Sequence, residues 1–202
     1  MSRDLKDGFT DVPPGKIAAV VTHLEMLSPA SLREVPESAA KSIRLVPEPD
    51  VQWYRDLYWR IGAIDWLWFS RLKLEPSALE AIIRHPNVEV YALASDERDE
   101  GLVELDFRNE GECELAFFGV TKRLIGRGAG RSLMNEAIER AWSRPIRRFW
   151  VHTCTMDHPG ALEFYVRSGF KPFRRQIEIA DDPRLSGLIP ESAAPQVPII
   201  RS

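Results

Sequence analysis

The stretch that decides the fold covers residues 122–142 and reads KRLIGRGAGRSLMNEAIERAW. Gly126, Gly128 and Gly130 stand directly before apolar residues that recur at helical spacing. The first amides of a helix have no partner within the helix and lie at the positive end of its dipole, so they attract anions. Glycine lets a phosphate approach the backbone closely. The stretch therefore predicts a phosphate-binding loop that leads into a helix from about residue 128 to residue 142.

Two common phosphate-binding motifs do not fit this loop. The dinucleotide fingerprint requires a third glycine where this sequence has Arg131, and nothing supplies the Gly-Lys-Ser/Thr of a P-loop. What remains is a backbone nest for a pyrophosphate, with Arg127 and Arg131 adding charge at its edge. A glycine-rich turn with solvated arginines is the alternative interpretation.

The neighbouring segments supply a second motif. The run CELAFFGV (residues 113–120) precedes the loop, and ALEFYVRSGF (residues 161–170) follows it. Together they resemble the GCN5-related N-acetyltransferase (GNAT) superfamily, with its R/Q-x-x-G-x-G/A pyrophosphate loop and its later A-x-x-x-Y-x-x-x-G-F motif. The resemblance covers about residues 43–180. It implies a GNAT-like acyl-CoA N-acyltransferase fold: a central, mostly antiparallel sheet with a splayed parallel pair and flanking helices.

The resemblance also implies which residues bind acetyl-CoA. The strand at residues 114–120 would splay from its neighbour, and a backbone amide near Phe117 or Phe118 would polarise the thioester carbonyl. The implied donor-binding residues are Phe118, Gly119, Val120, Gly126, Arg127, Gly128, Ala129, Gly130, Arg131 and His158. Two positions depart from the family pattern. Ile125 replaces the usual Gln or Arg of the loop. His158 replaces an asparagine, and it either contacts the pantetheine or caps the following helix.

Two residues are implied to move protons. Tyr165 matches a tyrosine that protonates the departing CoA thiolate in many family members. Glu114 occupies a strand position that holds a catalytic glutamate in some of them, and its apolar neighbours would raise its pKa by desolvation. A surface carboxylate is the alternative for Glu114, with Glu104 and Asp106 as reserve bases. A packed aromatic is the alternative for Tyr165.

A metal site is not expected. His152, Cys154 and His158 invite that interpretation, but three mixed ligands without a fourth make core or pocket-lining roles the better account. The only cysteines, Cys113 and Cys154, read as reduced thiols in a cytoplasmic protein. No segment resembles a signal peptide or a membrane span.

Composition places the chain among globular proteins. It has 202 residues, of which 44% are hydrophobic and 28% charged, and a net charge of −3. We expect one domain over residues 1–202, with an N-terminal extension (1–42) and a C-terminal tail (181–202) outside the resemblance. The acidic balance argues against nucleic acid as a partner, and no membrane partner is expected. The aromatic segment or the apolar run QVPII (196–200) offers a homodimer contact.

Periodicity predicts the α+β (α/β mixed sheet) class. Strands are expected at residues 17–26, 42–46, 88–95, 102–107, 113–120, 148–153 and 171–180. Helices are expected at residues 50–60, 76–85 and 159–168 besides the one after the glycine loop, and residues 53–72 should form an aromatic helix pair. Asp50 should cap the first helix. The strand–helix–strand unit around the loop implies a right-handed parallel crossover.

These expectations converge on an acetyl-CoA-dependent N-acetyltransferase. The acceptor would be a primary amine of a small molecule, which attacks the thioester directly in a ternary complex. A non-catalytic acyl-CoA sensor on the same fold and a protein N-acetyltransferase are the alternatives.

Overall fold

The computed structural model describes residues 7–36, 42–95 and 98–201. Its centre is one mixed sheet with the strand order β2-β3-β4-β5-β6-β1-β7. The strands are β1 (Lys16–Met26), β2 (Ser42–Leu45), β3 (Val88–Ser95), β4 (Arg98–Asp106), β5 (Glu112–Val120), β6 (Arg148–Cys154) and β7 (Lys171–Asp181). All neighbouring pairs are antiparallel except β5 and β6, which are parallel. This arrangement confirms the predicted mixed sheet with one parallel pair.

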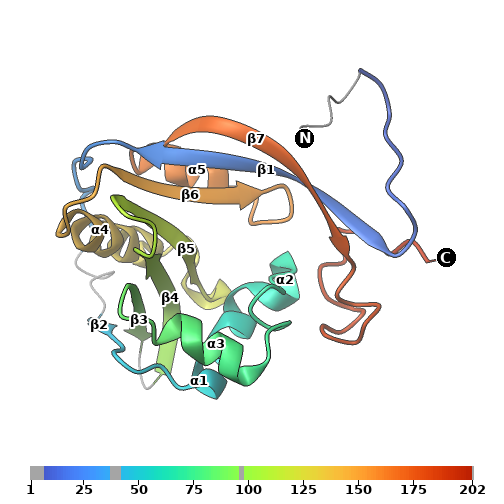
Figure 1. Ribbon diagram of the computed structural model, residues 1–202, viewed down its shortest axis with the longest axis horizontal. Coiled ribbons are helices and arrows are strands. Elements are labelled where there is room, and N and C mark those ends of the chain that lie inside the picture. Colours follow the sequence, from blue (N-terminus) through green and yellow to red (C-terminus); the bar gives the residue numbers. More distant parts are fainter. Residues whose placement is uncertain (1–6, 37–41, 96–97, 202) are drawn as a thin grey trace.

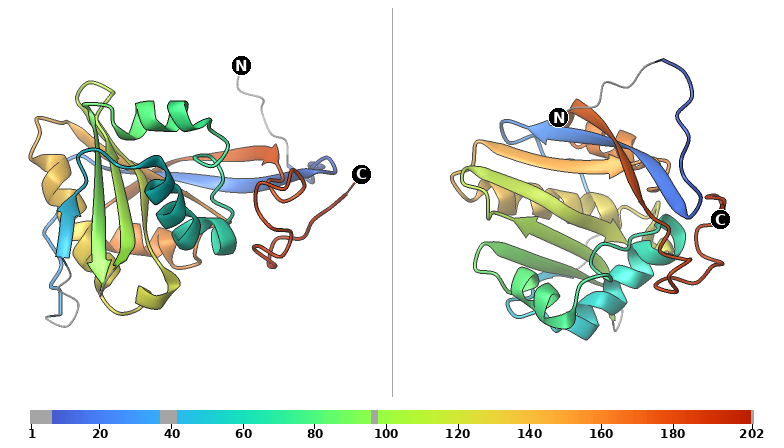
Figure 2. Two further views of the ribbon diagram at one scale, coloured as in Figure 1. Left: turned by 90° about the horizontal axis from the view of Figure 1, so that it is seen from below. Right: turned by 45° about the vertical axis from the view of Figure 1, so that its right-hand side comes forward.

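Helices pack on both faces of the sheet (Figures 1 and 2). The α-helices are α1 (Val51–Tyr58), α2 (Ile64–Trp66), α3 (Pro76–Ile83), α4 (Ala129–Trp142) and α5 (Ala161–Arg167), and a π-helical segment, η2 (Trp59–Ala63), joins α1 to α2. The apolar stripe of α4 and the ring of Tyr165 from α5 share one core with the middle strands. Helices α1 and α3 share a second core with β3 and β4. Asp50 caps α1 as predicted, accepting from the amide of Trp53 at 2.9 Å.

The predicted aromatic helix pair is wrong in its second half. α1, η2 and α2 form one continuous helical run that ends where Leu67 takes up a left-handed conformation (φ 53°). Residues 67–75 then form turns, in which the amide of Trp68 bonds the carbonyl of Gly62 at 3.1 Å. The helical spacing of Trp66, Phe69 and Leu72 therefore does not reflect a second helix: Trp66 ends α2, and Phe69 and Leu72 are partly buried in the turns that follow.

The N-terminal strand takes a place that its position in the sequence does not predict. β1 pairs with β6 through residues 21–26 and with β7 through residues 16–25. Residues 16–20 pair only with β7, so β1 and β7 continue beyond β6 as a two-stranded ribbon (Figures 1 and 2). Although residues 1–42 lie outside the family resemblance, part of this extension is thus an inner strand of the sheet.

The C-terminal segment braces the aromatic helical run. The amide of Ala194 bonds the carbonyl of Ile64 at 2.8 Å, and the Gln196 side chain bonds the carbonyl of Asp65 at 2.7 Å. A buried ion pair, Asp182–Arg184, anchors the segment, and Arg184 also donates to three of its backbone carbonyls. Val197, from the predicted dimer contact, packs within the chain.

The predicted splay of β5 from β6 is confirmed. Their parallel register ends at the pair Glu114–Trp150. One residue later, β5 carries a bulge against β4, because Glu104 lies opposite Phe117 while Leu105 lies opposite Leu115. A bulge bends its strand and interrupts the ladder. The two strands therefore separate where the residues predicted to bind the donor begin.

Candidate functional site

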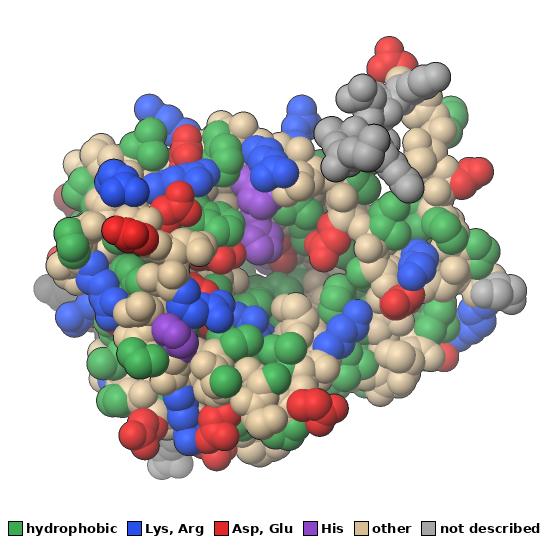
Figure 3. Space-filling view, viewed as in Figure 1, with side chains coloured by type: hydrophobic (Ala, Val, Ile, Leu, Met, Phe, Trp, Pro, Cys, Tyr) green, Lys and Arg blue, Asp and Glu red, His purple; other side chains and the backbone are tan. Residues whose placement is uncertain are grey.

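A cavity of about 1000 Å³ opens between the splayed strands and is walled by α5, the glycine loop and the aromatic segment. Figure 3 shows a hollow near the middle of one face of the molecule, with histidine side chains at its edge. Of the residues predicted for the site, the wall contains Glu114, Phe118, Gly119, Val120, Gly126, Gly128, Gly130, Arg131, His158 and Tyr165. Arg127 is exposed and Ala129 is buried in the core, and neither lines the cavity.

The glycine loop has the conformation of an anion nest. Gly126 (φ 77°) and Gly128 (φ 83°) both lie in the left-handed region, which a residue with a side chain enters at a cost. Gly128 is the N-cap of α4 and no side chain caps the helix. The first-turn amides of a 14-residue helix are therefore left for a ligand at the cavity wall.

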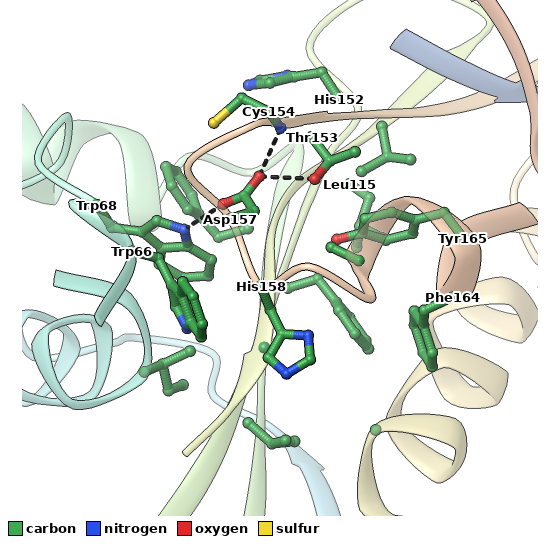
Figure 4. A pocket seen from close by; sticks show the side chains of 18 of the residues that line it. Trp66, Trp68, Leu115, His152, Thr153, Cys154, Asp157, His158, Phe164 and Tyr165 are labelled. Carbon is green, nitrogen blue, oxygen red and sulfur yellow. Dashed lines mark hydrogen bonds between the residues drawn. The ribbon is translucent and has the colours of Figure 1, made fainter. Parts of the chain in front are cut away.

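Tyr165 projects from α5 into the cavity. Its ring is buried at 7% exposure and packs at right angles to Phe170. Figure 4 shows the hydroxyl pointing away from α5, toward the space between the strands. Burial, and then the negative charge of Asp157, raise the pKa of Tyr165 above its ordinary value. A tyrosine of ordinary pKa is already protonated at neutral pH, so the shift keeps the proton on the hydroxyl and does not make it a stronger acid.

Glu114 and His152 face each other across the point where the strands part. The carboxylate of Glu114 lies 3.7 Å from Nδ1 of His152, and both side chains line the cavity. Glu114 raises the pKa of His152 above its ordinary value. His23 of β1 stands beside them, with its ring 5.6 Å from that of His152. The arrangement places a carboxylate and an imidazole together at a cavity wall, where they can accept a proton.

The two reserve bases are engaged elsewhere. Glu104 is fully buried and accepts from the hydroxyl of Tyr54 and from the guanidinium of Arg71. Asp106 accepts from the Arg108 side chain through both of its oxygens. Each of these carboxylates is thus held by a guanidinium group, whereas Glu114 faces the imidazole of His152.

Asp157 is a site residue that the sequence did not indicate. Its Oδ2 accepts from Oγ1 of Thr153 at 2.7 Å and from the amide of Cys154 at 2.8 Å, and its Oδ1 accepts from Nε1 of Trp68 at 3.1 Å (Figure 4). The carboxylate therefore joins the end of β6 to the aromatic wall. Trp68 lies 89 residues away in the chain, and no spacing signal connects the two.

The two cysteines are thiols, and they do not form part of a metal-binding group in the described residues. Cys113 and Cys154 are both free, and burial raises the pKa of Cys154 to about 11. A neutral thiol is a weak nucleophile, which agrees with a mechanism that uses no cysteine. Across the part of the chain that the structure describes, no group of three or more His, Cys, Asp or Glu side chains is placed to hold a metal ion.

Comparison with known families decides the classification. The model of the acetyltransferase (GNAT) family matches residues 49–170, more than half of the chain. The chain belongs to the GNAT family. It is therefore an acetyltransferase-family protein, with an acyl-CoA donor and an acceptor substrate implied by that family. A comparison with curated protein sequences gives no significant match.

Solved structures of other GNAT proteins share the fold. A putative GNAT acetyltransferase from Novosphingobium aromaticivorans is 17% identical with a TM-score of 0.58, and the match covers 83% of this chain and 67% of that one. A GCN5-related N-acetyltransferase from Sphaerobacter thermophilus is also 17% identical (TM-score 0.58), with coverages of 89% and 54%. A tandem GNAT protein from the clavulanic acid biosynthesis pathway is 15% identical (TM-score 0.56), with coverages of 86% and 55%. The chain thus spans about half to two thirds of these proteins, and the likeness bears on the fold alone.

The two departures from the GNAT pattern now have structural descriptions. Ile125 is exposed at 39% on the cavity wall and offers no polar group to a phosphate. Nδ1 of His158 accepts from the amide of Gly160 at 3.0 Å, ahead of α5, while its ring rests edge-on against Trp66. This bond goes to the N-cap residue and not to an amide of the first turn, and no side chain caps α5, so the predicted capping role of His158 is not found. The position borders the cavity, and contact with the pantetheine stays a prediction.

The described residues also bear on membrane insertion. None of their helices combines the length and the apolar character needed to cross a bilayer.

Proposed function

We propose that this protein transfers an acetyl group from acetyl-CoA to a primary amine of a small molecule by direct attack in a ternary complex. One observation carries the proposal. A single cavity joins the glycine nest of α4, the backbone of the splayed strand β5, and the side chains of Tyr165 and Glu114. These are the groups that binding an acyl-CoA and moving two protons require.

The donor would lie along β5 with its pyrophosphate on the nest. The backbone of Phe118, Gly119 and Val120 would hold the pantetheine arm, since the splay frees these residues from pairing with β6. Gly119 admits a close approach on its other side: a Cβ there would lie 2.4 Å from Cγ2 of Ile61. An amide at Phe117 or Phe118, next to the bulge, would polarise the thioester carbonyl.

Two different groups would carry out the two proton transfers, Glu114 as the base and Tyr165 as the acid. A protonated amine must lose a proton before it attacks, and Glu114, with His152 beside it, would accept that proton directly or through water. Tyr165, which is protonated at neutral pH and lines the cavity, would give its proton to the departing thiolate. No covalent enzyme intermediate is needed.

The cavity suits a small cationic acceptor. Besides Asp106, which Arg108 holds, three further carboxylates lie on its wall: Glu114, Asp157 and Glu178. Trp66, Trp68 and Phe117 add aromatic surface. A carboxylate attracts an ammonium group, and aromatic faces bind cations. These features support a small amine that fits entirely inside the cavity.

Acetyl-CoA titration and turnover with an amine panel test the proposal together. We expect acetyl-CoA to bind, and the variant Gly128→Glu to abolish binding by placing a carboxylate in the nest. Tyr165→Phe should lower kcat by at least about tenfold with little change in acetyl-CoA affinity. Binding without transfer to any amine would favour an acyl-CoA sensor, and transfer only to a protein would favour the protein acetyltransferase. Absence of acetyl-CoA binding by the wild type would refute the donor assignment.

A further inference from the structure

Residues 27–36 form a strap that crosses α5 and α4 and lies outside the segment matched by the family model. Ala30 packs on the core beside the end of α5, so close to Gly169 that a Cβ there would lie 2.5 Å from the Cβ of Ala30. Farther along, Asn135 of α4 accepts from the amide of Arg33 at 3.2 Å and donates to its carbonyl at 2.7 Å. The strap is therefore fixed at both helices through backbone and apolar contacts.

The strap brings a third arginine to the cavity wall near the glycine nest. Arg33 comes from the strap, Arg131 from the first turn of α4 and Arg167 from the last turn of α5, and all three line the cavity. Nη1 of Arg131 donates to the carbonyl of Glu34 at 2.7 Å, which fixes it against the strap. Arg167 pairs with Glu163, an exposed carboxylate one turn earlier on α5.

Within residues 7–36, 42–95 and 98–201, no acid or carbonyl accepts a hydrogen bond from the guanidinium of Arg33. Desolvation, and then the positive charges of Arg131 and Arg167, lower the pKa of Arg33. Among the described residues these three guanidinium groups have one carboxylate partner, Glu163, so they repel one another. An anion bound among them would relieve that repulsion.

We propose that Arg33, Arg131 and Arg167 form a second phosphate site beside the nest, which binds the 3′-phosphate on the ribose of the acyl-CoA donor. The inference rests on the proposed function, because that donor carries a pyrophosphate and a separate phosphate monoester in one molecule. The nest amides of α4 suit the pyrophosphate. The guanidinium cluster on the strap side suits the dianionic monoester, since planar arginines bind phosphate oxygens in pairs.

The test compares acetyl-CoA with its 3′-dephospho form by calorimetric titration. The wild type should bind acetyl-CoA roughly tenfold to a hundredfold more tightly. Arg33→Gln should lose about tenfold in affinity for acetyl-CoA and leave the affinity for the dephospho form unchanged. The strap should survive this change, because Asn135 holds the backbone of residue 33 and not its side chain. Arg140→Gln, on the exposed far end of α4, is the matched control and should bind both ligands like the wild type.

The outcomes distinguish failure of the phosphate site from failure of the proposed function. If the wild type binds neither ligand, both fall together. If it binds both equally well, or if Arg33→Gln weakens both equally, only the phosphate site falls. Competition by adenosine 3′,5′-bisphosphate and by adenosine 5′-monophosphate needs no variant. Equal potency of the two would also overturn the site, whereas clearly stronger competition by the bisphosphate would support it.

Discussion

The link between Asp157 and Trp68 allows a quantitative test of how the cavity is held open. In Asp157→Asn the side-chain oxygen can still accept the two hydrogen bonds that Oδ2 accepts in the wild type, from the hydroxyl of Thr153 and the amide of Cys154. The new amide group would then face Nε1 of Trp68, so that two donors oppose each other where a bond of 3.1 Å exists now. The change is nearly isosteric and therefore isolates that one bond.

The expected cost follows from the charge of the acceptor. A hydrogen bond to a charged group contributes about 1.5–3 kcal/mol, and an unpaired buried donor adds its own desolvation cost. We expect Asp157→Asn to lower the free energy of unfolding by about 2 kcal/mol. Trp68→Phe should lose the same bond and also ring contacts with Tyr58 and Phe117.

Urea denaturation of the two single variants and the double variant measures the coupling between the residues. If the bond joins the aromatic wall to β6, the double variant should be more stable than the sum of the single effects predicts, by about 1–2 kcal/mol. Asp56→Asn, on the exposed side of α1, is the control and should cost at most about 0.5 kcal/mol. A coupling energy below about 0.5 kcal/mol would refute the reasoning. The KM for the amine should rise in Asp157→Asn without a matching loss of acetyl-CoA affinity.

Three further predictions concern stability and proton binding. Asp182→Asn should lower the free energy of unfolding by about 3–5 kcal/mol at neutral pH, because the buried Arg184 loses its carboxylate partner. The ion pair lowers the pKa of Asp182, so the difference between variant and wild type in urea denaturation should shrink as the pH falls through that lowered pKa. Glu114→Gln should lower the pKa of His152 measured by NMR, because Glu114 raises that pKa in the wild type. The variant should therefore be less stable than the wild type below about pH 6.5, and the difference should vanish as the pH rises through the pKa of His152 in the folded protein. An unchanged titration curve would show that the pair does not interact. Gly126→Ala should cost about 1 kcal/mol through its left-handed backbone alone, because a Cβ there meets nothing within 4 Å, and a larger loss in thermal or urea unfolding would contradict this.

Local signals in the sequence predicted most of the elements. The capping carboxylate of Asp50 and the apolar stripe of α4 act within a few residues of where they stand, so spacing alone located α1 and α4. The error at residues 67–75 has a tertiary origin. There Phe69 and Leu72 follow helical spacing in a turn that begins at Leu67 and packs against the C-terminal segment.

Some residues of the site were likewise predictable from local motifs, and others depend on tertiary packing. Two separate motifs predicted the nest and Tyr165, and the structure places both at one cavity. Asp157 carries no motif, because its role depends on a ring that folding brings to it. Glu104 and Asp106 were reserve bases in the sequence, and their engagement by Arg71 and Arg108 became visible only from packing.

The sequence by itself indicated the glycine loop and the helix that follows it, because glycine permits the left-handed backbone that Gly126 and Gly128 adopt. Only the tertiary structure decided that the N-terminal strand lies between β6 and β7 and that Arg33 of the strap reaches the same cavity. Strand order and side-chain convergence depend on contacts between segments more than a hundred residues apart, as in the pairing of Val21 with Cys154. No local pattern encodes contacts at that separation, so their energies are settled only when the whole core assembles.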